Sequence, residues 1–295
     1  MVVAVISALA AAAFFAAGSA LQHQSAGAIP AFTGFGLRGV SRFVWDTLRH
    51  PSWLAGSGAD VVGLGFHALA LNQGPLTLVQ PVLVTGVIFA LPMRAALDRR
   101  PPARNEMVLA VILAAGLILF LVAATPGSPA VAPADHTPVV ITVVVVAITM
   151  AVCAGAGRRL RGSAAATVLG VGAGISFAAT AGALKGTTDA LSHGLITVFT
   201  GWPLYLLVAG GAVGLLFNQL AFSAGPLRAS LPAITTLDPL ASMAIGVVVY
   251  DDQLRTGPGA LIGAAVGLAI VVAATLALTR SEAGPEPCPE RSMRQ

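Results

Sequence analysis

The amino-acid sequence predicts an all-α integral membrane protein with about nine transmembrane helices. Three observations indicate this class: little charge, long apolar blocks and no β-barrel pattern. Of the 295 residues, 56% are hydrophobic and only 9% are charged, whereas a soluble domain carries about 25% charged residues. This composition excludes a soluble enzyme and an intrinsically disordered chain. Many apolar blocks exceed the roughly 20 residues that a helix needs to cross a bilayer. The strict alternation over about 10 residues that marks a membrane strand is missing.

Nine apolar runs define the predicted helices. The first run has no Lys or Arg before it, since Arg38 is the first basic residue, so it is interpreted as a retained span and not as a signal peptide. The predicted spans are Val2–Leu21, Trp53–Leu71, Leu76–Leu97, Met107–Ala124, Val139–Gly155, Ala164–Ala183, Trp202–Phe222, Ala229–Val249 and Gly259–Leu278.

The basic residues predict the orientation, because Lys and Arg collect on the cytoplasmic side of a membrane protein. With the N-terminus outside and the C-terminus inside, 14 of the 16 basic residues fall in cytoplasmic segments. Only Lys185 and Arg255 fall outside. The sequence pI of 9.8 then reflects topology and contact with the lipid bilayer, not a nucleic-acid partner. The expected location is the plasma (inner) membrane.

The chain is expected to divide into two halves with a link and a tail. Residues 1–125 form a first repeat, residues 126–162 a linking loop with the fifth helix, and residues 163–280 a second repeat. Residues 281–295 are polar and proline-rich, which is typical of a disordered cytoplasmic tail. Within the first half, apolar residues near 38–49 recur at helical spacing opposite arginines. They predict an interfacial amphipathic helix, with a mobile basic loop as the alternative.

An internal repeat links the two halves. The segment from Phe66 to Leu76 resembles the segment from Phe217 to Leu227 at a gap-free offset of 151 residues. The same offset carries Pro81 onto Pro232 and Gly116 onto Gly267, and the first and sixth helices match at a slightly longer offset. Corresponding helices lie five spans apart, an odd number, so they cross the membrane in opposite directions. Inverted repeats of this kind are typical of secondary transporters that work by alternating access.

Proline-interrupted helices in corresponding positions are the best sequence pointer to a transport site. The third and eighth predicted helices fit, with Gly74-Pro75 and Pro81 in one and Gly225-Pro226 and Pro232 in the other. The first proline of each pair is explained by helix initiation alone. Pro81 and Pro232 lie further inside, so they are the candidates for broken backbone whose free carbonyls face a cavity.

Asp238 is the leading candidate for a substrate-binding or coupling residue. It lies near the centre of the eighth predicted helix, close to Thr235 and Thr236. A carboxylate at that depth costs roughly 2.5–3.5 kcal/mol on insertion scales, so it is expected to face an interior cavity, where it could take up and release a proton. The competing interpretation is structural: Asp238 caps the kink made by Pro239.

Three further polar residues are weaker candidates for a substrate-binding or gating role. His67 and Asn218 occupy equivalent positions of the repeat, which suits two symmetric gates or site walls, although a lone histidine in a helix is more often a packing residue. Gln80 precedes Pro81 but corresponds to Leu231, so its role would be confined to one half. Lys185, the single lysine, is expected to end the sixth helix and to reach the headgroups at the outer surface.

Other patterns indicate packing rather than chemistry. Glycines four apart, at Gly259, Gly263 and Gly267 and at Gly170 and Gly174, let helices approach closely within a protomer or in a homodimer. The sequence contains no Walker motif, no His/Cys/carboxylate group with metal-enzyme spacing and nothing that places a catalytic triad. The chain is therefore expected to be neither an enzyme nor a carrier of a cofactor or a bound metal.

The repeated segments resemble the drug/metabolite transporter superfamily, and EamA-type and NIPA-like members in particular. The resemblance rests on the Ala-x-x-x-Gly-Pro segments Ala70–Pro75 and Ala221–Pro226, each leading into a proline-containing helix. It also rests on the turn Asp251-Asp252-Gln253-Leu254, similar to a Gly-Glu-Arg-Leu turn of the family, with Asp251 at the glycine and Asp252 at the glutamate. The resemblance implies a central cavity, alternating access without ATP and the loss of one helix from a ten-helix form.

The function expected from these observations is secondary transport of a small metabolite or drug-like solute, with proton coupling through Asp238. A NIPA-like magnesium transporter is the alternative, since Mg²⁺ favours oxygen ligands that Asp238, Thr235, Thr236, Gln80 or Asn218 could supply. A second alternative, from another class, is a membrane accessory protein without transport.

Overall fold

The computed structural model describes residues 1–26, 50–98, 104–124, 137–225, 227–253 and 257–282. Within these ranges, nine helical segments are long and apolar enough to span a membrane, which confirms the predicted all-α class with about nine spans. The predicted amphipathic segment near 38–49, and the tail beyond residue 282, lie outside the described residues. The helices are α1 Val2–Ala26, α3 Pro51–Gln73, α4 Leu76–Leu83, α5 Gly86–Asp98, α6 Arg104–Ala124, α7 Thr137–Arg159, α8 Gly162–Ser192, α9 Leu195–Thr200, α10 Trp202–Ala224, α11 Leu227–Tyr250 and α12 Pro258–Glu282.

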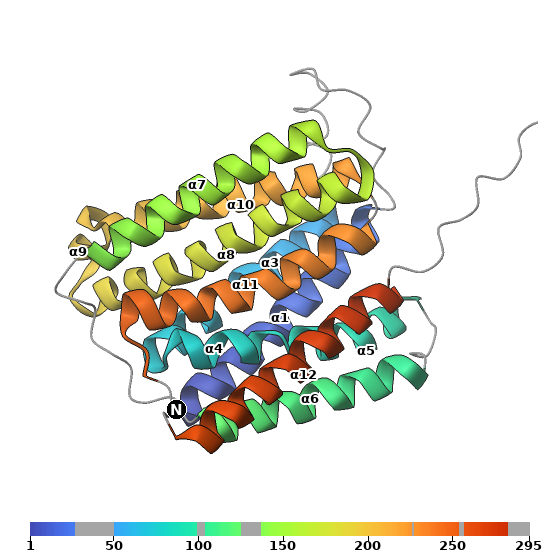
Figure 1. Ribbon diagram of the computed structural model, residues 1–295, viewed down its shortest axis with the longest axis horizontal. Helices are drawn as coiled ribbons and strands as arrows, with labels where there is room; N and C mark the ends of the chain where they lie inside the picture. Colours follow the sequence, from blue (N-terminus) through green and yellow to red (C-terminus); the bar gives the residue numbers. More distant parts are fainter. Residues whose placement is uncertain (27–49, 99–103, 125–136, 226, 254–256, 283–295) are drawn as a thin grey trace, which may run out of the picture.

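The helices form one bundle in which several elements pack along one another as pairs. Helix α1 packs along α3, α8 packs along α10, and α6 packs along α12. In Figure 1, α6 and α12 lie on one side of the bundle and α7 and α10 on the opposite side, with α8 and α11 between them. The largest buried apolar cluster joins α1, α3, α4, α6, α8, α11 and α12, so the core runs through the centre of the bundle.

Two helices differ from their predicted extents. The predicted sixth span ended at Ala183, but α8 continues to Ser192, about two more turns. The predicted third span is divided: α4 ends at Leu83 and α5 begins at Gly86. The short helix α9 between α8 and α10 was not predicted.

The exposed arginines gather at one end of the bundle. Arg104 begins α6, Arg158 and Arg159 end α7, and Arg161 precedes α8; all four are exposed. Figure 1 places these helix ends together, opposite the end that holds the N-terminus and α9. We call the end with the arginines the basic end, and the other the N-terminal end.

Contacts made in one half of the chain recur in the other. A Cβ added to Gly63 would lie 2.8 Å from Cδ1 of Phe15, and a Cβ added to Gly214 would lie 2.8 Å from Cδ1 of Phe177. Gly214 follows Gly63 by 151 residues, and Phe177 follows Phe15 by 162 residues. The α1–α3 pair and the α8–α10 pair therefore share one close contact between equivalent residues.

The same two offsets relate a second pair of contacts, at the start of the proline-containing helices. A Cβ on Gly74 would lie 2.7 Å from Cβ of Ala4, and a Cβ on Gly225 would lie 3.1 Å from Cβ of Ala166. Gly225 follows Gly74 by 151 residues, and Ala166 follows Ala4 by 162 residues. The two glycines of the Gly-Pro segments therefore each pack against an earlier helix, Gly74 against α1 and Gly225 against α8.

Gly116 and Gly267, which the offset of 151 residues makes equivalent, face each other where α6 crosses α12. A Cβ on Gly116 would lie 3.1 Å from the carbonyl oxygen of Gly267, and a Cβ on Gly267 would lie 2.8 Å from the carbonyl oxygen of Gly116. Such a reciprocal contact is what two equivalent residues make when they lie on a two-fold axis. The close helix packing predicted at Gly267 is confirmed.

Candidate functional site

The interruption between α4 and α5 lies next to a small internal cavity. The carbonyl of Val82 accepts hydrogen bonds from the backbone N–H of Thr85 at 3.0 Å and from its hydroxyl at 2.6 Å, so the chain makes a tight turn one helical turn after Pro81. The cavity measures about 10 Å³, close to the minimum for one water molecule. Its walls come from the broken helix, α11 and α12: Pro81, Val84, Thr235, Thr236, Pro239, Leu268, Val271, Val272 and Thr275.

This cavity brings together three of the predicted site residues, Pro81, Thr235 and Thr236. The hydroxyl of Thr236 is buried and has no hydrogen-bond partner among the described residues, so the cavity presents an unused polar group. The expectation for Pro232 is wrong as far as the backbone is concerned, because α11 remains helical through Pro232. Thr235 donates to the carbonyl of Pro232 at 3.4 Å within α11.

Two other candidates also meet. The side-chain nitrogens of Gln80 and His67 lie 3.5 Å apart between α4 and α3, and both residues are buried. Phe15 contacts the His67 ring edge-on, with the ring centroids 6.2 Å apart. Asn218, the repeat equivalent of His67, is a partly buried residue of α10. The structure thus pairs His67 with Gln80 within the first half.

Asp238 lies apart from the small cavity. Its Oδ1 accepts a hydrogen bond from the hydroxyl of Ser242 at 3.3 Å, one turn later on α11. The side chain is partly exposed, and it lines neither this small cavity nor the larger cavity between α7, α8, α10 and α11. Gly174 of α8 packs against the backbone of α11 here, with its Cβ position 3.2 Å from the nitrogen of Asp238. Asp238 therefore remains a predicted coupling residue.

At the N-terminal end, Lys185 holds the turn between α3 and α4, and the prediction that it reaches the membrane surface is wrong. Lys185 is 1% exposed. Its Nζ donates to the carbonyl of Leu71 at 3.2 Å and lies 3.5 Å from the carbonyl of Gly74, which have no partners within α3. The same amine lies 5.4 Å from the ring centroid of Tyr250, whose hydroxyl donates to the carbonyl of Gly182 at 2.6 Å.

Asp252 completes this polar cluster from the loop that joins α11 to α12. The backbone N–H of Thr77, in the first turn of α4, donates to Oδ2 of Asp252 at 3.0 Å. Asp252 thus caps a helix 175 residues earlier in the chain. Asp251 has φ +50°, the left-handed region, where a glycine would be unstrained. We call Lys185, Tyr250, Asp252 and the turn Leu71–Thr77 the capping cluster.

Exchange of Asp252 for alanine is expected to lower the free energy of unfolding by about 1–2 kcal/mol, because α4 loses its cap. Asn retains an acceptor, so Asp252→Asn is the matched control.

Burial raises the pKa of Asp252, against the opposing effects of the Thr77 N–H and Lys185. The protonated acid therefore stabilises the fold at low pH, and this contribution is lost as the pH rises through the raised pKa. Thermal unfolding in detergent should find the Asn variant at least as stable as wild type at neutral pH.

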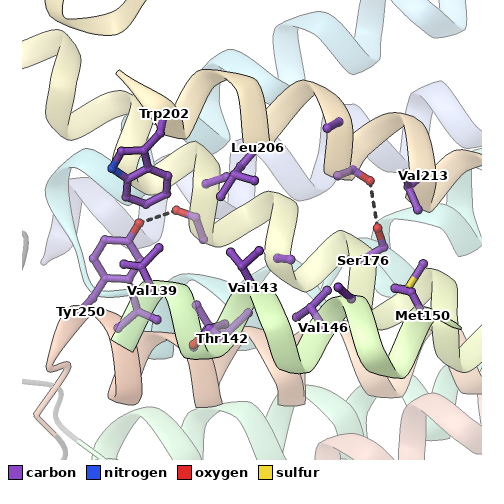
Figure 2. A pocket seen from close by; sticks show the side chains of 18 residues that line it. Val139, Thr142, Val143, Val146, Met150, Ser176, Trp202, Leu206, Val213 and Tyr250 are labelled. Atoms are coloured by element: carbon purple, nitrogen blue, oxygen red, sulfur yellow. Dashed lines mark hydrogen bonds between the residues drawn. The ribbon is translucent and has the colours of Figure 1, made fainter. Parts of the chain in front are cut away.

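A larger cavity of about 390 Å³ lies between α7, α8, α10 and α11, and we call it the lateral groove. Figure 2 shows it running from Trp202 and Tyr250 at one end to Met150 and Val213 at the other. Its two buried hydroxyls are already used: Ser176 donates to the carbonyl of Gly210 at 2.9 Å, and Tyr250 donates to Gly182. The lining is otherwise mainly apolar: Val139, Thr142, Val143, Val146, Ala147, Met150, Ala179, Gly182, Ala183, Trp202, Leu206, Ala209, Gly210, Val213, Ile245 and Val249.

Comparison with known proteins identifies one relative of similar length. The chain is 29% identical over 258 residues to Cgl0250/cg0304, an uncharacterized protein of Corynebacterium glutamicum. The alignment covers 85% of this chain and 86% of the relative, so the similarity extends over most of both chains. No protein-family model and no solved structure matches the chain.

The capping cluster is what sequence reasoning missed. Lys185 was assigned to the surface because the sixth helix was predicted to end two residues before it. A signal was present: Lys185 is the single lysine, and a Gly-Pro turn between apolar helices leaves carbonyls that need a donor. Asp252 had been noted only as the counterpart of a family glutamate.

Proposed function

We propose that the protein is a secondary transporter of a small metabolite or drug-like solute that works by alternating access, with its two halves related as inverted repeats. The recurrence of contacts at the offsets of 151 and 162 residues carries this proposal. Chance similarity between apolar helices does not explain why equivalent residues make equivalent contacts in both halves. An odd separation of five spans then requires the halves to run in opposite directions.

The broken helix supports a solute site near the middle of the bundle. Pro81 and the α4–α5 turn meet Thr235 and Thr236 of α11 at the small cavity, where equivalent positions Val84 and Thr235 face one another. Interrupted helices are tolerated at membrane depth where they line a cavity or are buried in protein. A cavity of about 10 Å³ holds no solute, so this conformation is one in which the site is closed.

The capping cluster supports closure at the N-terminal end, which we infer to be the outer end. It ties the α3–α4 turn of the first half to α8 and α11 of the second half through Lys185 and Asp252. The exposed Arg104, Arg158 and Arg161 at the basic end favour a cytoplasmic placement of that end. No observation on the described residues favours the magnesium alternative, since they contain no group of three or more His, Cys, Asp or Glu side chains able to hold a metal ion.

Transport is tested with purified protein in liposomes that contain a pH-sensitive dye and a Mg²⁺ indicator. Amino acids, cationic drugs and Mg²⁺ are added in turn to wild type, Asp238→Asn and Asp251→Asn. We expect solute-dependent proton flux in wild type, at least a tenfold loss in Asp238→Asn because the coupling carboxyl is gone, and little change in Asp251→Asn, whose acid is exposed in a loop.

Each other outcome has a distinct meaning. Mg²⁺ entry without proton movement would replace the proposal by the magnesium alternative. Equal flux in wild type and Asp238→Asn would assign Asp238 to structure and leave transport standing. Absence of flux for every solute, from protein shown to be folded, would contradict transport and favour the accessory class.

A further inference from the structure

We infer that the lateral groove binds one acyl chain of a bilayer lipid, with the lipid headgroup at the Trp202 end. The inference is independent of the proposed transport, since a lipid chain could occupy the groove in a transporter or in an accessory protein. It depends on the length, polarity and opening of the groove.

The opening is lateral. Val143 and Ala147 on α7 and Ala209 and Val213 on α10 line the groove and are exposed, so its mouth lies on the outer face of the bundle between these two helices. Both helices are candidate membrane spans, and hydrocarbon is therefore the medium at the mouth. A ligand from the bilayer can enter sideways without crossing a polar surface.

The groove is long and follows the two helices that form its mouth. The lining runs from Val139 to Met150 on α7 and from Trp202 to Val213 on α10, which at about 1.5 Å per residue is about 16 Å. The cavity of about 390 Å³ is spread along this length, so an elongated apolar ligand can lie in it parallel to the two helices.

The polarity also favours hydrocarbon. The hydroxyls of Ser176 and Tyr250 are satisfied by Gly210 and Gly182, so they offer little to an ordered water or a polar solute. An unfilled groove would deprive its lining of dispersion contacts, which a flexible chain restores. Trp202, which is 40% exposed, and Tyr250 stand at one end, and such amphipathic rings favour the headgroup level of a membrane. The methyl end of the chain then points toward Met150.

The test uses liposomes that contain a phospholipid with a photoactivatable diazirine near the methyl end of one acyl chain. After irradiation, peptide mass spectrometry locates the adducts on wild type. We expect adducts concentrated at the inner part of the groove, around Val146, Met150 and Val213. A second phospholipid with the diazirine near the carboxyl end of the chain should move them toward Val139, Trp202 and Tyr250.

Two variants make the result specific. Ala147→Phe places a ring in the mouth of the groove and is expected to reduce groove adducts at least tenfold. Val145→Phe adds the same ring to an exposed position of α7 that does not line the groove, and should leave them unchanged. The inference is overturned if adducts are spread evenly over the exposed faces of α6, α7, α10 and α12. It is also overturned if Ala147→Phe and Val145→Phe carry the same amount of adduct in the groove. It is also overturned if labelling occurs only with a free photoactivatable fatty acid, which would identify a different ligand.

Discussion

Replacement of Lys185 by methionine is expected to lower the free energy of unfolding by about 2–3 kcal/mol, because hydrogen bonds from a buried charged donor contribute about that much. Methionine matches lysine in length and helix propensity, so α8 itself should persist. What is lost is the donor for the carbonyls of Leu71 and Gly74, which then lie buried at the end of α3 without a partner. The α3–α4 turn should loosen first.

Thermal unfolding of the purified protein in lipid nanodiscs measures this effect, and hydrogen exchange of peptides that cover residues 71–80 locates it. Arg158→Met is the control, because it removes an exposed positive charge at the basic end and should change stability by less than about 0.5 kcal/mol. If Lys185→Met and Arg158→Met unfold alike, the capping cluster does not stabilise the fold. If stability falls while exchange near the turn is unchanged, the loss arises elsewhere in α8.

The fold could be predicted because a helix that spans a membrane requires a long run of apolar residues, which is visible in the sequence. All nine predicted spans have a counterpart among the described helices. Helix ends were less predictable. The sixth predicted helix ends at Ala183, just before Lys185. In the structure α8 continues to Ser192, and Lys185 donates a hydrogen bond to the carbonyl of Leu71 from within the helix. Local polarity is a poor guide where a buried partner satisfies the charge.

The candidate site could be predicted only in part, because tertiary contacts also decide where a helix is interrupted. Pro81 and its sequence equivalent Pro232 both lie inside a helix, but the helix that contains Pro81 ends at Leu83, whereas α11 continues past Pro232 to Tyr250. A proline only removes one backbone hydrogen bond, and neighbouring contacts decide whether the helix opens there. The lateral groove had no sequence signal, because its walls are the ordinary apolar residues of four spans.

Gly267→Ala is expected to have the second large effect, a loss of about 1–3 kcal/mol, because the added methyl group has no space. Its Cβ would lie 2.5 Å from the backbone nitrogen of Phe120 and 2.8 Å from the carbonyl of Gly116, so α6 and α12 would have to separate. Side chains can rotate away from an intruding methyl group, but backbone atoms cannot. Thermal unfolding in lipid nanodiscs against wild type gives the size of the effect.

Gly259→Ala is the matched control on the same row of α12. No atom lies within 4 Å of its Cβ position, so this exchange should be neutral or stabilise the helix by up to about 1 kcal/mol. Gly263, whose Cβ position lies 2.8 Å from the side chain of Ala123, should fall between the two. A graded series, with Gly267→Ala least stable and Gly259→Ala most stable, would locate the close crossing of α6 and α12 at Gly116 and Gly267. Equal stability of all three variants would mean that the helices do not approach as closely in the membrane, and it would remove the reciprocal glycine contact from the support for two equivalent halves.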